Sequence, residues 1–231
     1  MNKVLDQELS ILLNKTSKPV DWMESTRTGK PVTAAYTEYP LAFAGPVKQL
    51  STAETIKTSD IKRMLKLVED GANIECASPA DGFTLLMRVA EFGSKDFLEK
   101  TLAHNPMVDR QNLAGETALH RAALLDRKKS VEILLAAGAS PFSKDKKGFE
   151  PLDLAYSEDK DHDAIIAALL NARQSFIKVH HVAATPIDKA FAEDRAYTDR
   201  VRKLLEDRVE AKWDEITHQP PRVMPKGKGS R

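Results

Sequence analysis

The sequence predicts an all-α solenoid, in which short helix–turn–helix units stack one on another. Two observations lead to this fold class. Glycines recur at Gly82, Gly115 and Gly148, in two steps of 33 residues. After each glycine the chain carries two short apolar stretches with helical spacing. A fixed period of this length indicates stacked repeats, because no single unit can bury both of its faces alone.

Each unit reads as a turn, a short helix, a tight bend and a second helix. Gly71 and Gly138 follow second helices, where a left-handed residue ends a helix without a Cβ clash. Thr84 and Thr117 stand where a side chain caps the first helix. The 33-residue step also aligns two core columns, which are Leu86, Leu119 and Leu152, and Val89, Ala122 and Ala155.

One unit carries a family resemblance. Residues 115–123, Gly-Glu-Thr-Ala-Leu-His-Arg-Ala-Ala, and residues 134–140, Leu-Leu-Ala-Ala-Gly-Ala-Ser, resemble an ankyrin repeat. The single departure is Ala118, where the family usually has proline. The resemblance implies that His120 ties neighbouring hairpins together by hydrogen bonds.

The neighbouring units resemble the family less closely. Residues 81–87 lack both the proline and the histidine, and the unit at 148–155 has Glu150 and Asp153 where the family has threonine and histidine. A more decayed unit is predicted before them, with a capping box at 51–54. The resemblance therefore implies an ankyrin-repeat domain over residues 50–172.

The flanks do not follow the repeat. Residues 1–49 are predicted to form a short helix and an extended, proline-containing arm that packs on the array. Residues 173–218 are predicted to form a helical extension that starts at Thr185 and Pro186. It is either one long helix or two joined near residues 198–199. Its apolar face packs on the last repeat or on the arm, or serves a partner or self-association. Residues 219–231 are predicted to be a disordered basic tail.

Composition narrows the function classes. The 35 basic residues nearly balance the 34 acidic ones, which gives no reason to expect nucleic acid or an anionic membrane as the main partner. Cys76 is the only cysteine, so no intrachain disulfide and no thiolate zinc cluster can form. The sequence shows no signal-peptide pattern and no membrane span. We expect a cytoplasmic protein, or one exported without a cleaved signal.

Candidate catalytic chemistry is weak. His180 and His181 are adjacent rather than at helical ligand spacing, and the acidic run at 158–163 lacks the glycine of a calcium loop. We interpret the first as surface or core imidazoles and the second as a solvated loop. No cofactor, metal or small-molecule substrate is expected.

Arrays of this family usually bind partners through the hairpin tips and the exposed side of the first helices. Several residues at these positions are apolar, so together they would form an exposed strip, unless the arm or the C-terminal helix covers it. The predicted contact residues are Asp81, Phe83, Glu91, Phe92, Gln111, Leu113, Glu116, Leu124, Leu125, Lys144, Lys146, Lys147, Phe149 and Glu158.

The resemblance therefore implies a non-catalytic module that binds another protein as an adaptor or an inhibitor. A bacterial effector or immunity-type protein is one class that fits the worn repeats and long flanks. Two alternatives stay open. One is an enzyme with a site between the flanks and the array, and the other is nucleic-acid binding through the basic tail, with its salt dependence.

Overall fold

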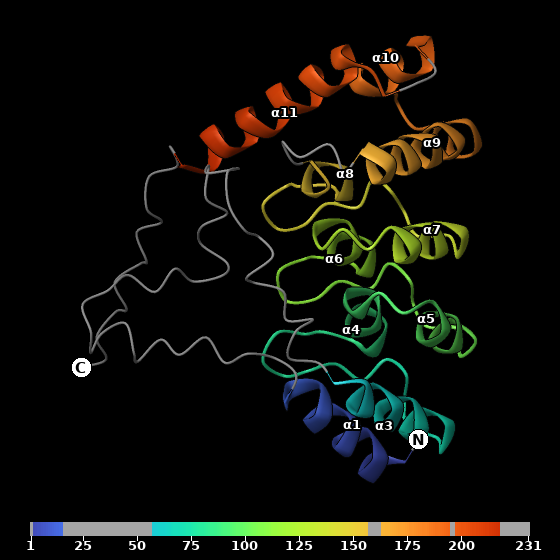
Figure 1. Cartoon of the computed structure of the whole chain (residues 1–231). Helices are drawn as coiled ribbons and strands as arrows, with labels where there is room; N and C mark the ends of the chain where they lie inside the picture. Colours follow the sequence, from blue (N-terminus) through green and yellow to red (C-terminus); the bar gives the residue numbers. More distant parts are fainter. Residues whose placement is uncertain (1, 16–56, 157–162, 195–196, 218–231) are drawn as a thin grey trace, which may run out of the picture.

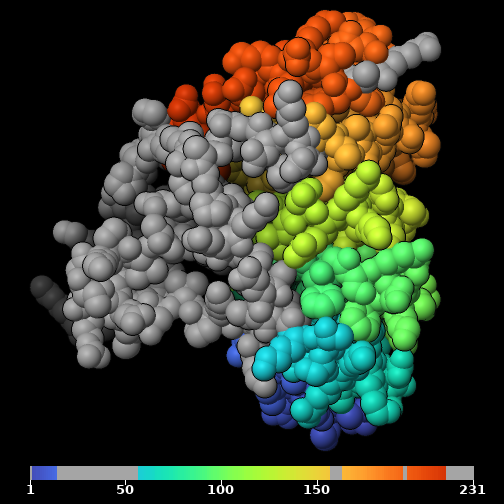
Figure 2. All heavy atoms as spheres, in the orientation of Figure 1, coloured from blue at the N-terminus to red at the C-terminus, as the bar shows by residue number. Residues whose placement is uncertain are grey.

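The computed structural model describes residues 2–15, 57–156, 163–194 and 197–217. Within these ranges every regular element is a helix, apart from an isolated antiparallel bridge between Ala77 and Thr84. The predicted all-α solenoid is confirmed. The described residues form one continuous stack that runs from the N-terminal helices to the C-terminal ones (Figure 2).

The helices are arranged in two columns (Figure 1). The inner column, on the side of the hairpin loops, holds α4 (Leu85–Phe92), α6 (Ala118–Leu124) and α8 (Pro151–Leu154). The outer column holds α3 (Thr58–Glu69), α5 (Lys95–Leu102), α7 (Lys128–Ala136) and α9 (Asp163–His180). The two predicted core columns, from Leu86 and Val89 onward, are buried between the layers.

The predicted caps are present at the first helices. The Thr84 hydroxyl accepts a hydrogen bond from the Met87 backbone N–H, and the Thr117 hydroxyl accepts one from that of His120. His120 also reaches the next layer, because its Nε2 lies 3.1 Å from the Phe149 carbonyl oxygen. The histidine thus links neighbouring hairpins, as the resemblance implied.

The hairpin loops form a ladder of backbone hydrogen bonds. The Leu113 N–H donates to the Asp81 carbonyl at 2.9 Å, and one repeat later the Lys146 N–H donates to the Ala114 carbonyl at 3.0 Å. Gly115 permits this close approach, because a Cβ at that position would lie 2.7 Å from the Lys146 nitrogen. The ladder holds successive tips at a fixed spacing.

The first layer includes the predicted N-terminal helix. The expected capping box at 51–54 lies outside the described residues, and α1 (Lys3–Lys15) packs against α3. Asp6 on α1 accepts a 2.6 Å hydrogen bond from the Asn73 N–H. In later layers Glu75 and Asp109 accept equivalent bonds from the next outer loop. The N-terminal helix is therefore part of the stack and not only of a flanking arm.

The C-terminal extension forms two helices, α10 (Pro186–Asp194) and α11 (Asp199–Thr217). The predicted start is confirmed, since the Thr185 hydroxyl accepts a bond from the Asp188 N–H at 3.3 Å. Helix α10 packs against α9 and α11 against α8, so the outer position is filled before the inner one, the reverse of a repeat. The apolar face of α11, including Val201 and Leu205, is buried within the chain. That face is therefore already occupied within the chain.

Several predictions concern segments that the structure does not describe. The extended arm after residue 15, the basic tail and most of the acidic run at 158–163 lie outside the described residues. None of the described helices is long and apolar enough to cross a membrane.

Candidate protein-binding surface

The predicted contact residues differ widely in exposure. Four are open to solvent, which are Gln111, Leu113, Lys144 and Lys146. Five are half-buried, which are Asp81, Phe92, Leu124, Leu125 and Lys147. Four are buried, which are Phe83, Glu91, Glu116 and Phe149. Glu158 lies outside the described residues. The expected exposed apolar strip included Phe83 and Phe149, and both of these side chains are buried.

Phe83 is buried because two arginines lie against its ring. The side chain is only 1% exposed. The guanidinium carbon of Arg88 lies 4.0 Å from the ring centroid, and that of Arg121 lies 5.2 Å away. A cation over an aromatic face is an attractive pair, most of all when it is withdrawn from water. Phe83 thus serves the interior of the array.

Glu91 and Glu116 are buried as ion-pair partners of the same arginines. Arg121 donates from Nε to Glu91 at 2.7 Å and from Nη1 to Glu116 at 3.3 Å. Arg88 reaches the other oxygen of Glu91 at 3.3 Å. Glu91 thus links two layers, whereas Glu116 is paired within its own unit. Both are bonded because a buried charge requires a partner. The sequence could have predicted this pairing, since the two arginines stand one repeat apart.

Phe149 is covered by the C-terminal helix, which was the alternative left open for the strip. Its ring centroid lies 5.1 Å from that of Trp213 on α11, and the Lys212 ammonium lies 5.4 Å from it. The chain itself therefore supplies the partner for the third hairpin's aromatic residue.

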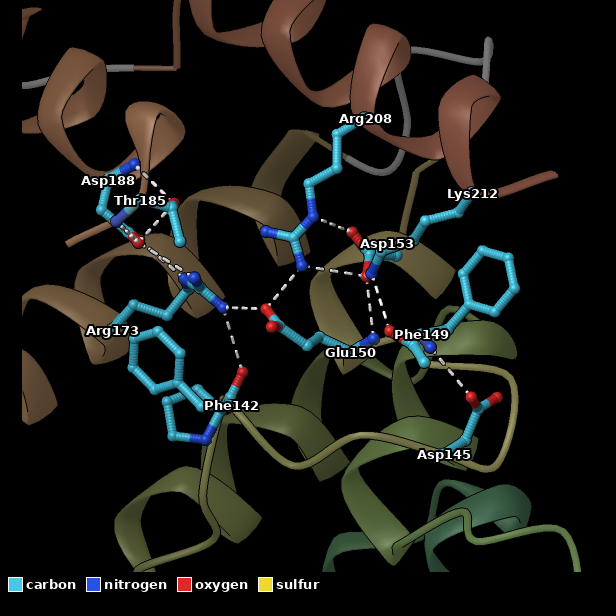
Figure 3. A network of polar contacts seen from close by, with 12 residues as sticks. Phe142, Asp145, Phe149, Glu150, Asp153, Arg173, Thr185, Asp188, Arg208 and Lys212 are labelled. Atoms are coloured by element: carbon cyan, nitrogen blue, oxygen red, sulfur yellow. Dashed lines mark hydrogen bonds and ion pairs between the residues drawn. The ribbon is translucent and has the colours of Figure 1, made fainter. Parts of the chain in front are cut away.

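A buried ionic network joins this region to the extension (Figure 3). Arg173 on α9 is fully buried and donates to both carboxylate oxygens of Asp188, at 2.7 and 2.9 Å. It also donates to Glu150 at 2.6 Å and to the Pro141 carbonyl at 3.3 Å. We call the set Glu150, Asp153, Arg173, Asp188, Arg208 and Lys212 the C-terminal clamp.

Helix α11 completes the clamp. Arg208 lies 2.7 Å from Glu150 and 2.9 Å from Asp153, and the Lys212 ammonium lies 2.5 Å from Asp153. Glu150 and Asp153 occupy the positions of Thr117 and His120 one repeat earlier. The threonine and histidine pair that receives another repeat is thus replaced by two carboxylates that receive two basic side chains of α11.

Glu150 and Asp188 of the clamp stay charged near neutral pH. Burial raises the pKa of Glu150, but the guanidinium groups of Arg208 and Arg173 outweigh it and bring the pKa below its ordinary value. Asp188 behaves alike, since burial is opposed by hydrogen bonds from Arg173 and Thr185 and its pKa is lowered. Both of these acids are held as anions by neighbouring donors. The arrangement suits a structural joint rather than proton transfer.

The exposed predicted residues gather at two neighbouring hairpins, and we call Gln111, Leu113, Lys144 and Lys146 the hairpin-tip patch. The Gln111 amide donates to the Lys144 carbonyl at 2.9 Å and links the two loops. Leu113 is 58% exposed. No group of three or more His, Cys, Asp or Glu among the described residues is placed to hold a metal ion.

Comparison with known proteins agrees with this architecture. Residues 53–145 match ankyrin repeats in three copies. Mouse diacylglycerol kinase iota is 29% identical over 133 residues, an alignment that covers 55% of this chain and 12% of the kinase. A putative ankyrin repeat protein of fowlpox virus is 30% identical over 133 residues, or 54% of this chain and 38% of the viral protein.

A third relative belongs to another class. The E3 ubiquitin-protein ligase Ufd4 of Drosophila melanogaster is 27% identical over 129 residues, which cover 55% of this chain and 5% of the ligase. The match with this chain thus spans only a small part of most of these relatives. The shared feature is the repeat region, a fold that is typically non-catalytic.

Proposed function

Because this chain is an ankyrin-repeat protein, we propose that it is a non-catalytic binding module that docks another protein through the hairpin-tip patch. Ankyrin repeats generally mediate protein–protein interaction. The proposal includes a role as an adaptor, or as an inhibitor that covers a surface of its partner. The setting we propose is the cytoplasm, which suits a chain whose only cysteine has no second one to pair with.

The observation that carries the proposal is an exposed leucine on a rigid loop. Leu113 is 58% exposed, while its backbone is fixed to the preceding hairpin by the bond to Asp81. A scaffold that presents loops in fixed positions is the usual arrangement of a binding surface. An apolar side chain held in place pays little ordering entropy on binding, so it suits an anchor.

The polar groups inside the stack support a non-catalytic role. The enzyme alternative placed a site between the flanks and the array, and the C-terminal clamp lies at that junction. Its carboxylates are bound by Arg173, Arg208 and Lys212, which leaves them committed to the fold. A general base needs access to a substrate proton, which such a saturated pair lacks.

The test is site-specific photocrosslinking in the native cell. A photoreactive amino acid replaces Leu113 in one variant and Val179 in a matched control, since Val179 is 69% exposed on the outer helix α9. We expect a discrete crosslinked protein from position 113 and none of that mass from position 179. Leu113→Asp should then weaken binding of the identified protein, whereas Val179→Asp should not.

Two outcomes would contradict the proposal. One is a crosslinked protein obtained equally from both positions, and the other is unchanged affinity after Leu113→Asp. The identified partner also separates the two roles, because an inhibitor lowers the partner's own activity on binding and an adaptor leaves it unchanged.

A further inference from the structure

We propose that the hairpin-tip patch selects an acidic segment of its partner protein, with an apolar side chain against Leu113 and carboxylates paired with Lys144 and Lys146. The inference rests on the proposed binding function and adds the chemistry of the partner. It follows from three features of the patch. Leu113 packs on the neighbouring hairpin, Lys144 and Lys146 are exposed without a described acidic partner, and the patch presents no aromatic ring.

The leucine is seated on the neighbouring hairpin. A Cβ at Gly82 would lie 3.0 Å from the Leu113 Cγ, so the side chain rests directly on that glycine. The same glycine lies beneath the Leu113 nitrogen, which bonds to Asp81. The exposed part of Leu113 therefore has a defined position, and a partner side chain can pack on it without ordering a loop.

The two lysines next to it are open and have no acid opposite them within the described residues. Lys144 and Lys146 are both exposed, and no ion pair joins either of them to a described carboxylate. The nearest acid in sequence, Asp145, accepts hydrogen bonds from the N–H groups of Lys147 and Phe149. It is thus committed to shaping the turn.

The same turn carries a third lysine, Lys147, whose side chain is half-buried. Complementary charge across an interface mainly raises the association rate and rejects wrong partners. Carboxylates flanking an apolar residue are the complement that this tip fits.

A protein fits better than a nucleic acid at this place. Single-stranded nucleic acid is held by basic grooves in which aromatic rings stack on the bases. The aromatic residue of the third hairpin, Phe149, is buried beneath Trp213 and presents no face. An exposed leucine among lysines offers a base nothing to stack on but offers an apolar side chain a contact.

The experiment measures fluorescence anisotropy of two labelled peptide pools with the full chain. One pool has glutamate and aspartate around a central leucine, and the other has glutamine and asparagine in their place. The test variant is Lys144→Glu with Lys146→Glu. The control variant is Lys128→Glu with Lys129→Glu, which makes the same charge change at exposed positions of α7.

We expect the acidic pool to bind at least about tenfold more tightly than the amide pool, with an affinity that falls as salt rises. The test variant should lose about tenfold in affinity for the acidic pool, while the control variant stays within about twofold of the unchanged chain.

Equal binding of the two pools, or equal loss in both variants, overturns the proposal. A single-stranded oligonucleotide that binds through Lys144 and Lys146 more tightly than the acidic pool also overturns it, in favour of nucleic acid. These failures leave the proposed function intact if position 113 still crosslinks a protein. If that crosslink is absent as well, both fail together.

Discussion

Arg173 and Asp188 form a fully buried, two-bonded ion pair that joins the last outer helix to the C-terminal extension. The guanidinium and carboxylate planes are matched by two hydrogen bonds, which is the strongest geometry for such a pair. Because the same arginine also holds Glu150, one side chain connects α9, α10 and the last hairpin.

Arg173→Met should therefore lower the free energy of unfolding by about 3–5 kcal/mol, since it leaves the buried Asp188 carboxylate without its charged partner and takes one of two arginines from Glu150. Urea unfolding followed by circular dichroism measures the change. Arg200→Met is the control, because Arg200 is 60% exposed in its pair with Glu193 and should cost at most about 1 kcal/mol. Equal losses in the two variants would falsify the assignment of Arg173 as the main joint.

His120 should make the fold sensitive to mild acid. Burial lowers the pKa of its imidazole, although the hydrogen bond to the Phe149 carbonyl opposes the shift. Below about pH 6.5 the His120 imidazole binds a proton in the unfolded chain but stays neutral in the folded chain. Stability is therefore full above that value and falls as pH drops toward the folded-state pKa.

Urea midpoints at about pH 7.5 and about pH 5.5 measure this loss, with His120→Gln as the comparison. The variant should be less stable at the higher pH and should lose less on acidification. If both proteins lose the same amount, other groups account for the effect.

Two glycines give a paired test of the hairpin ladder. Both Gly115 and Gly138 have positive φ, 84° and 90°. An added Cβ would strike the Lys146 nitrogen in the first case and meet nothing within 4 Å in the second. Gly138→Ala should cost about 1–2 kcal/mol from backbone strain alone.

Gly115→Ala should cost clearly more than Gly138→Ala, because the Lys146 to Ala114 bond must lengthen as well. Thermal unfolding of the two variants compares them directly. A smaller cost at position 115 would mean that the loops shift apart without penalty and that the ladder is not rigid.

Trp213→Ala should destabilise one end of the stack. The indole is 7% exposed and covers Phe149, so its removal should cost about 3 kcal/mol. Since each layer contacts only its neighbours, the loss of protection should be confined to α8, α9, α10 and α11. Amide hydrogen exchange resolved by peptide mass measures this.

Val179→Ala serves as the control for that experiment, because its exposed side chain should change stability by less than about 0.5 kcal/mol. Loss of protection that spreads evenly to α4 and α6 would contradict a nearest-neighbour stack.

The repeats could be predicted because their determinants are local and periodic. Gly115, Thr117 and His120 act within one unit or on the next, and a fixed step makes them visible in the sequence. Burial at the tips could not be predicted in the same way. Phe83 and Glu91 lie where the family usually binds partners, yet in this chain they are paired with arginines from two layers.

The packing of α1 in the first layer could not be predicted, for a different reason. Helix α1 shows an apolar face in sequence, but its contact with Asn73 crosses 67 residues and follows no period. The C-terminal clamp could be predicted only in part. Glu150 and Asp153 were seen as departures from the family pattern, while their partners Arg208 and Lys212 stand on a helix outside the repeat.

That distance between Asp6 and Asn73 has a consequence during synthesis. A ribosome adding about 5–20 residues per second needs roughly 3 to 13 seconds to pass from one to the other. Over that interval Leu9 and Leu13, which end up buried, have been synthesised before the first layer on which they pack is complete. The nascent chain therefore presents an apolar helix early, and chaperones that hold unfolded segments have this interval in which to bind it.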